Sequence, residues 1–274
     1  MIKNLKMTVL IDNVASEPLS AEWGLSIWIE ADGTILLLDT GAGSLFAKNA
    51  GLLGVNLADV EFGVLSHAHY NHADGMETFF AVNEKAPFFL RTGSGENCFG
   101  IDNGELSYCG IREGTLETYA GRIRYVEGVY RVADSIWLLP HRKADYALIA
   151  QKNDLYIKRN GTCCLDDFAH EQTLVIETEK GLVVFNSCSH TGMTNILQDV
   201  EEMLGRNDVC AYVGGLHLNH FADDELLSLS DEIRRSGVAP VFTGHCTGDH
   251  AYQILKKELG DGIVQFSSGF RHTF

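Results

Sequence analysis

The chain has 274 residues, a mass of 30.2 kDa and a formal net charge of −16. Its hydrophobic fraction of 45% and charged fraction of 21% are typical of a globular protein, and they exclude disorder, collagen and coiled coil. Because so acidic a chain repels nucleic acid and anionic membranes, we expect neither of them as a partner. The composition leaves the oligomeric state open.

No apolar run approaches the roughly 20 residues that span a bilayer, and the apolar stretch at the N-terminus is too short for a signal peptide. We therefore expect a cytoplasmic protein. The seven cysteines are odd in number and form no CxxC pair. This usage indicates reduced thiols and not a disulfide framework.

The first third of the chain alternates apolar segments with turn residues. Asp32-Gly33 predicts a hairpin between two of the strands. The expected strands are Met7–Ile11, Leu25–Glu30, Ile35–Leu38, Gly63–Ser66 and Phe88–Arg91, and the expected helices are Ser44–Leu53 and Ala73–Lys85.

The range 92–146 has the least regular pattern and is interpreted as a lid or insertion, with strands at Ile123–Val126 and Ile136–Leu139. Two hairpins are expected after it, joining Tyr146–Ala150 to Leu155–Lys158 and Thr173–Thr178 to Leu182–Phe185. In the last third, helical periodicity over 196–204, 223–237 and 254–260 alternates with strands at Cys210–Val213, Val238–Phe242 and Ile263–Phe266. The pattern predicts a layered α/β protein with mixed sheets, and the length fits either one large domain or two.

The densest chemistry follows the predicted strand Gly63–Ser66. His67, His69 and His72 lie within six residues, and an extended chain points His67 and His69 to the same side. Imidazole binds zinc, iron and related metals, and α/β proteins place their sites in the loops at strand ends. The sequence therefore predicts a metal site at this loop.

Three further histidines follow predicted strands in the second half of the chain. His190 follows Leu182–Phe185, His217 follows Cys210–Val213, and His245 follows Val238–Phe242. Each is expected at a strand end, where it could serve as a metal ligand. Taken singly, each could also be an ordinary loop histidine.

These motifs resemble the metallo-β-lactamase superfamily. The resemblance rests on the segment Ser66-His-Ala-His-Tyr-Asn-His72, preceded by Leu36-Leu-Leu-Asp39-Thr-Gly41. Ser187-Cys-Ser-His-Thr-Gly192, Gly214-Gly-Leu-His217 and His245-Cys-Thr-Gly248 are similar to one subgroup, the 7,8-dihydropterin-6-methyl-4-(β-D-ribofuranosyl)aminobenzene-5'-phosphate synthase-like proteins. The resemblance covers nearly the whole chain. It implies a single domain over 1–274, folded as a four-layer αββα sandwich with two mixed β-sheets.

The resemblance also implies one or two divalent metal ions, with zinc first and iron or manganese as alternatives. By position, His67 and His69 would bind the first metal, with His190 as the candidate third ligand, and His72 and His245 would bind the second. Asp39 would not bind metal but would orient the histidine loop by hydrogen bonds.

The sequence departs from the family pattern at two places. Asn71 occupies the position of a family aspartate, and its neutral amide is a weaker ligand that cannot act as a base near neutral pH. Trp23 occupies a position where the subgroup often has histidine. Asp74 could compensate for Asn71, or could simply lie in the first turn of a helix.

Three further residues are candidates for extra ligands or substrate contacts. Asp167 lies in the segment Asp166–His170, near where the superfamily places another ligand. Cys188 and Cys246 are each within two residues of a proposed ligand, and thiolates bind zinc well. Loop capping and core packing are the alternative roles.

The resulting function is a metal-dependent hydrolase or transferase. A metal that activates water or acts as a Lewis acid would act on a small ester, phosphoester or pyrophosphate-type substrate. Two alternatives stay open at this point: a metal-containing sensor or scaffold in which Asn71 has weakened catalysis, and an iron-dependent redox enzyme.

Overall fold

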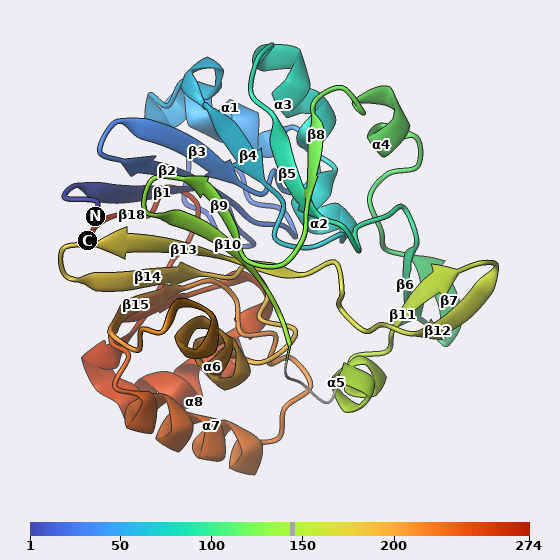
Figure 1. The fold of residues 1–274 in the computed structure, drawn as a ribbon. Helices are drawn as coiled ribbons and strands as arrows, with labels where there is room; N and C mark the ends of the chain where they lie inside the picture. The colour runs from blue at the N-terminus through green and yellow to red at the C-terminus, as the bar shows by residue number, and fades with distance from the viewer. Residues whose placement is uncertain (143–145) are drawn as a thin grey trace. The chain divides into compact units, whose positions relative to one another are not determined.

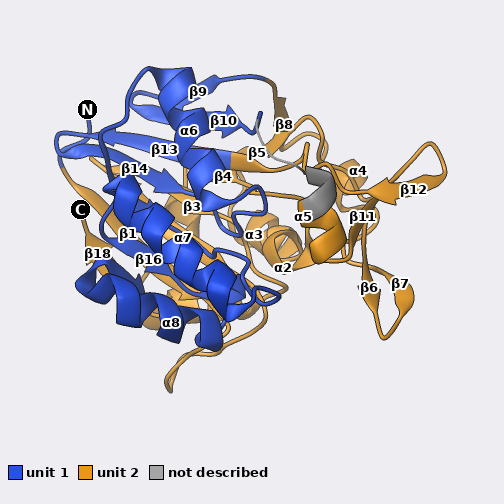
Figure 2. Cartoon of the chain, turned by 90° about the horizontal axis from the view of Figure 1, so that it is seen from below, with its two compact units in different colours: residues 1–3, 128–144, 173–266 blue, residues 4–127, 145–172, 267–274 orange. Residues whose placement is uncertain are grey.

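The computed structural model describes residues 1–142 and 146–274, with the side chains of 146–148 left aside. The chain forms two compact units (Figure 2). Unit 1 comprises residues 1–3, 128–144 and 173–266, and unit 2 comprises residues 4–127, 145–172 and 267–274, in both cases as far as those residues are described. Each unit is described by itself below.

Unit 2 contains a seven-stranded mixed sheet. Its order is β18(Arg271–Thr273), β1(Leu5–Ile11), β2(Ser26–Ala31), β3(Thr34–Leu38), β4(Phe62–Val64), β5(Phe88–Arg91) and β8(Ile123–Val126). The strands from β18 to β3 pair antiparallel, and those from β3 to β8 pair parallel. The carboxyl ends of β3, β4 and β5 therefore share one edge, where the histidine loop begins.

Helices cover one face of this sheet. The unit contains α1(Leu45–Leu53), the 3₁₀ turn η1(Leu57–Asp59), α2(Tyr70–Ala73), α3(Met76–Val82), α4(Thr115–Thr118) and α5(Tyr146–Lys152). Phe46 of α1 and Phe79 of α3 pack with Leu37 and Phe88 of the sheet in one fully buried cluster, as the positions of α1 and α3 beside β4 in Figure 1 illustrate. Burial of such side chains contributes about 1.5–3 kcal/mol each, so this cluster holds the helices on the sheet.

A smaller antiparallel sheet completes unit 2. Its order is β12(Thr162–Leu165), β11(Leu155–Arg159), β6(Cys98–Asp102) and β7(Glu105–Tyr108). Asn103-Gly104 connects β6 to β7 and Asn160-Gly161 connects β11 to β12, and all four turn residues have positive φ. Asn-Gly favours such turns because both residues tolerate the left-handed region.

Unit 1 contains the other seven-stranded mixed sheet. Its order is β17(Ile263–Gln265), β16(Val241–Thr243), β15(Val209–Val213), β14(Gly181–Phe185), β13(Gln172–Thr178), β10(Ile136–Pro140) and β9(Tyr130–Ala133). The strands from β14 to β17 are parallel, so their carboxyl ends meet at one edge.

Three helices lie beside the parallel strands of unit 1 (Figure 1). They are α6(Met193–Leu204), α7(Asp223–Ser236) and α8(Asp249–Leu259), and the 3₁₀ turns η2(His245–Thr247) and η3(Gly260–Gly262) precede and follow α8. Ile196, Leu226 and Leu255, one from each helix, pack with Val184 and Tyr212 of the sheet. Charges at the ends of α7 favour the helix, because its first turn is acidic and its last turn is basic.

The mixed α/β class with mixed sheets is confirmed, as is the Asp32-Gly33 hairpin. Two predicted elements are wrong. The segment Tyr146–Ala150 is part of helix α5 and not a strand, because a short apolar run has no distinguishing period and alanine favours helix. The predicted helix Ala73–Lys85 is interrupted at Asp74-Gly75 and ends at Val82.

The range 92–146 contains β6 to β10 and α4. Its strands enter three different sheets, two in unit 2 and one in unit 1. Its residues 143–145 lie outside the described part of the chain, and the lid stays a prediction. Among the described residues, no helix is long and apolar enough to cross a membrane.

Candidate metal centre

The histidine loop is residues 66–72, which follow β4 in unit 2. His67 and His72 are fully buried and His69 nearly so. The ring centroid of His67 lies 4.7 Å from that of His69 and 4.2 Å from that of His72. A ligand nitrogen of His67 also lies within 4.8 Å of one on each of these two rings. The structure thus brings the three predicted histidines together.

Asp39 organises this loop from the end of β3. Its Oδ1 accepts a hydrogen bond from the Ser66 amide at 2.7 Å, and its Oδ2 pairs with the Ser66 hydroxyl at 2.7 Å and with His72 Nδ1 at 2.8 Å. The carboxylate is fully buried and Asp39 has a φ of +59°. Bonds to a buried carboxylate are stronger than neutral ones, so the loop is held firmly.

These hydrogen bonds also assign the tautomers of two histidines. The single hydroxyl hydrogen of Ser66 is donated to Asp39, so the hydroxyl accepts from His67 Nδ1, which lies 2.8 Å away. His72 Nδ1 likewise donates to Asp39. Because Nδ1 carries the hydrogen in both rings, Nε2 carries the lone pair, as a metal ligand requires.

A second buried cluster lies behind the loop in unit 2. His170 Nδ1 accepts from the amide of Ala68 at 3.1 Å, and His170 Nε2 pairs with Asp166 at 3.0 Å. Burial alone would raise the pKa of Asp166, but the electrostatic attraction and the hydrogen bond of the His170 ring lower it to about 2. Asp166 and His170 form a compact group with Cys98 and His69, whose ligand atoms lie within 4.8 Å of one another.

The sequence did not identify this second buried cluster as a group. Asp167, the predicted residue, instead forms a two-pronged ion pair with Arg159 at 2.6 and 2.7 Å, and its neighbour Asp166 faces the histidines. The segment 166–170 was noted as a whole, but nothing in the pattern around Cys98 pointed to the loop.

Asn71 and Asp74 also lie on or beside α2. Asn71 is buried, and its backbone carbonyl accepts a hydrogen bond from the amide of Leu25 at 3.2 Å. Asp74 accepts from the amide of Arg112 at 2.8 Å, and burial raises the pKa of its carboxyl. Among the described residues, Asp74 belongs to none of the clusters whose side chains could bind a metal together.

In unit 1, three loops follow the parallel strands β14, β15 and β16. Backbone hydrogen bonds connect them. The amide of Gly215 donates to the carbonyl of Ser187 at 2.8 Å, and the amide of Leu218 donates to the carbonyl of Cys246 at 3.1 Å. A Cβ on Gly215 would lie 2.5 Å from Cys246 Sγ, so glycine allows the close approach. The loops therefore assemble as one layer at the sheet edge.

This layer collects the predicted residues of the second half. Cys188, His190 and His217 have ligand atoms within 4.8 Å of one another, and so do Cys188, His245 and Cys246. The rings of His190 and His217 have centroids 4.2 Å apart. His217 and His245 have φ of +52° and +49°, a conformation uncommon outside glycine that concentrates at functional sites.

The donor sets fit a divalent metal ion. In unit 2 the buried imidazoles of the histidine loop are oriented by Asp39 and Ser66, and in unit 1 imidazole and thiol donors converge within ligand distance of one another. Imidazole and thiolate are the ligands that zinc prefers, and imidazole also suits iron and manganese.

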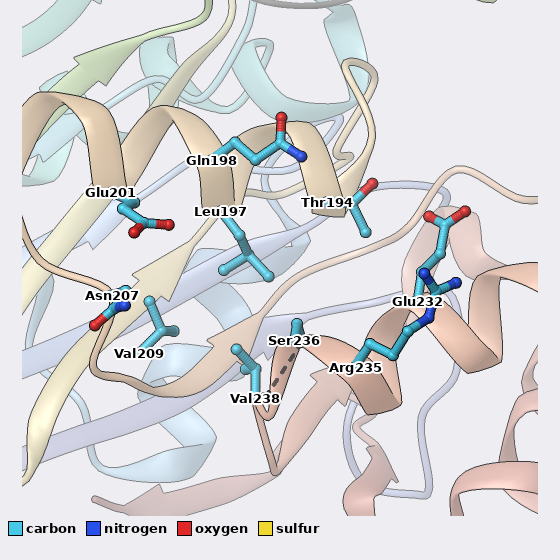
Figure 3. Close-up of a pocket in the computed structure, with 10 residues that line it drawn as sticks. All are labelled: Thr194, Leu197, Gln198, Glu201, Asn207, Val209, Glu232, Arg235, Ser236 and Val238. Atoms are coloured by element: carbon cyan, nitrogen blue, oxygen red, sulfur yellow. Dashed lines mark hydrogen bonds between the residues drawn. The ribbon is translucent and has the colours of Figure 1, made fainter.

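Cavities of about 490 Å³ in unit 1 and about 600 Å³ in unit 2 have described linings that contain none of the loop histidines. One of about 490 Å³ is bordered by Leu197 and Glu201 of α6 and by Glu232 and Arg235 of α7 (Figure 3). Its described lining contains no histidine or cysteine, so it offers no comparable chemistry. The other, of about 600 Å³ in unit 2, is bordered by Tyr70 and Asp74, which flank the end of the histidine loop.

Solved structures that are similar to this chain identify its fold. A crystal structure described as a metal-dependent hydrolase of the β-lactamase superfamily is 29% identical, covers 98% of each chain and has a TM-score of 0.80. The chain has the metallo-β-lactamase fold. The metallo-β-lactamase fold protein YhfI from Bacillus subtilis, at 12% identity, 99% and 100% coverage and a TM-score of 0.57, shares the same fold.

A curated relative extends the resemblance predicted from the motifs, which is confirmed. The 7,8-dihydropterin-6-methyl-4-(β-D-ribofuranosyl)-aminobenzene-5'-phosphate synthase of Methanocaldococcus jannaschii is 27% identical over 98% of this chain and 96% of its own. No protein-family model matches the chain. The proteins to which this metallo-β-lactamase-fold chain is similar include a synthase and a hydrolase.

Proposed function

We propose that the protein is a metal-dependent hydrolase or transferase for a small-molecule ester, phosphoester or pyrophosphate-type substrate. The observation that supports this most is the buried hydrogen-bond network of Asp39, Ser66 and His72, which orients histidine nitrogens as ligands. The similarity to a hydrolase and to a synthase over nearly the whole chain agrees with it. When bound, a divalent metal supplies Lewis-acid polarisation of the substrate and lowers the pKa of a coordinated water.

The proposed ligands are the histidines that the motifs indicate. In unit 2 they are His67, His69 and His72 of the histidine loop. In unit 1 they are His190 and His245, with Cys188, His217 and Cys246 as further candidates. We propose zinc as the metal, and iron or manganese would bind the same imidazoles. Asp39 acts through Ser66 and His72 by fixing their hydrogen bonds, and it does not contact the substrate.

Asn71 limits the acid–base chemistry that we expect of this site. Its amide cannot take a proton at neutral pH, so this side chain does not serve as a general base. The proposed reaction therefore depends on the metal and its imidazole ligands. For the same reason, a metal-containing sensor with weakened catalysis is the second candidate function.

The test compares turnover of bis(4-nitrophenyl) phosphate by the purified protein, His72→Ala and His250→Ala. His250 is a suitable control because it is exposed and pairs only with the exposed Asp223 among the contacts described for it. We expect His72→Ala to lose at least 100-fold in rate and His250→Ala to keep the parent rate. Equal rates for all three proteins would contradict the proposal.

Asn71→Asp separates the two candidates. For an enzyme whose site is built around asparagine, the added carboxylate leaves the rate unchanged or lowers it. For a sensor that lost its catalytic carboxylate, the substitution raises the rate toward that of a competent hydrolase. The same substrate and assay serve for both readings.

A further inference from the structure

Unit 1 contains a buried histidine–carboxylate pair outside the set of proposed ligands. Asp199 lies on the buried side of α6 and is 2% exposed, although Ile196 and Val200 beside it are apolar. Its Oδ2 accepts a hydrogen bond from the amide of Arg142 at 3.1 Å and lies 3.6 Å from Nδ1 of His141. Burial of a carboxylate among apolar side chains is costly, so packing alone does not explain this residue.

The ring of His141 connects this carboxylate to the loop 186–190, which follows β14. His141 directly follows β10, and its side chain is 1% exposed. Its Nε2 lies 3.3 Å from Asn186 Nδ2 and 3.4 Å from Thr173 Oγ1. One nitrogen of the ring thus faces Asp199, and the other faces the first residue of the loop.

Asn186 in turn shapes the loop 186–190. The side chain is fully buried, its Oδ1 accepts from the amide of Ser189 at 2.7 Å, and its Nδ2 donates to Thr173 Oγ1 at 3.0 Å. Ser189 has a φ of +50°, which is uncommon outside glycine. The hydrogen bond to Ser189 encloses Cys188 and ends one residue before His190. Asn186 therefore fixes the backbone that carries these two candidate ligands.

The same hydrogen bonds assign the tautomer of His141. Because Oδ1 of Asn186 accepts from Ser189, the amide group that faces the ring is the NH₂, which can only donate. His141 Nε2 must therefore accept, and the ring hydrogen lies on Nδ1, toward Asp199. A carboxylate likewise faces the Nδ1 hydrogen of a histidine at Asp39 in unit 2.

We propose that Asp199 and His141 are positioning residues that hold Asn186 and, through it, the loop 186–190. Neither of them contacts the substrate. The role of Cys188 and His190 as metal ligands rests on the proposed function, but the network of Asp199, His141 and Asn186 does not.

The first test determines the tautomer of His141 in metal-free protein by NMR of protein with ¹⁵N-labelled histidine. We expect a hydrogen on Nδ1 and none on Nε2. The signals of this ring are identified by their loss in His141→Gln. A hydrogen on Nε2, in either the neutral or the cationic ring, would overturn the proposal.

The second test measures how fast iodoacetamide labels Cys188 relative to Cys98 in the same metal-free protein. Both thiols are buried, but Cys98 belongs to unit 2, so the ratio of the two rates separates opening of the loop from global unfolding. We expect His141→Leu to raise this ratio about tenfold, because leucine fills space but accepts no hydrogen bond from Asn186.

Two further variants control this measurement. In His141→Gln the side-chain oxygen can accept in place of Nε2, so we expect a ratio within about threefold of the parent. Glu201→Gln alters an exposed carboxylate on the same helix as Asp199 and should leave the ratio unchanged. Both His141 variants remove the ring N–H that faces Asp199, so the comparison between them isolates the acceptor nitrogen.

An unchanged ratio in folded His141→Leu would overturn the proposal, and so would an equal rise in the leucine and glutamine variants. The tautomer of the parent protein decides the question where His141→Leu does not fold. With zinc added, we expect His141→Leu to bind metal about tenfold more weakly than the parent. A parent protein that binds no metal and turns over no substrate refutes the proposed function but still gives both metal-free measurements, so the two failures are distinguishable.

Discussion

Asp39→Asn is the substitution that probes the organisation of the histidine loop most sharply. Asparagine has nearly the same shape and, like aspartate, tolerates the φ of +59° at this position. Its carbonyl oxygen can still accept from the Ser66 amide. Its NH₂ group, however, replaces the oxygen that faces the Ser66 hydroxyl and His72 Nδ1.

Two charge-assisted hydrogen bonds are lost in this fully buried network. Each is worth about 1.5–3 kcal/mol net, and rotation of the hydroxyl recovers part of the loss, so we expect the free energy of unfolding to fall by about 2–4 kcal/mol. His72 can relieve the conflict by accepting from the new NH₂ group through Nδ1. Its hydrogen then moves to Nε2, which can no longer bind a metal in that tautomer.

The assay has two parts. Urea unfolding in the presence of a chelator measures stability without metal, and competition with a chromogenic chelator measures metal affinity. We expect affinity to fall by 10- to 100-fold. Asp154→Asn is the matched control, because Asp154 is exposed and has a φ of +51°. An Asp39→Asn protein within about 0.5 kcal/mol and twofold in affinity of the parent would refute this reasoning.

Two other predictions follow from local geometry. In Gly24→Ala the new Cβ would lie 2.7 Å from a backbone oxygen of the histidine loop, so we expect the free energy of unfolding to fall by about 1–3 kcal/mol and metal affinity to fall with it. In Gly51→Ala the new Cβ enters open space on helix α1, so we expect the free energy of unfolding to rise by about 0.5–1 kcal/mol. Equal urea midpoints for the two variants would contradict this. The exposed thiols of Cys163 and Cys164 should react first with iodoacetamide under native conditions, and Cys109 slowly because burial raises the pKa of its thiol. Peptide mass spectrometry measures both rates, and fast labelling of Cys109 in folded protein would count against that assignment.

The histidine positions could be predicted because their signal is local. A histidine that directly follows a buried parallel strand lies at the carboxyl edge of the sheet, whatever the details of packing. His67 and His69 after β4, and His190 after β14, follow this rule. The role of Ser66 was less accessible, since it depends on the 2.7 Å contact with Asp39 from a strand 27 residues earlier.

The cluster of Cys98, Asp166 and His170 behind the loop could be predicted only in part. The segment Asp166–His170 was indicated as near a ligand position, but Cys98 and Asp166 are far apart in the chain and meet only because β6 pairs with β11 in the small sheet. Of that sheet only β11 was predicted, as Leu155–Lys158, although Asn103-Gly104 and Asn160-Gly161 are as clear a hairpin signal as Asp32-Gly33. Its strands lack regular alternation because most of their side chains are exposed, and exposure removes the hydrophobic period that identifies a strand.

Metal content by mass spectrometry of freshly purified protein, expressed without added metal, decides whether the chain holds a metal site. We predict at least one equivalent of a divalent metal per chain, with zinc first. We also predict that His67→Ala lowers this content and that His250→Ala leaves it unchanged. Two equivalents would show that the chain retains a second site despite Asn71, and one would place the chemistry on a single ion. A protein that retains no metal even after reconstitution would contradict the account.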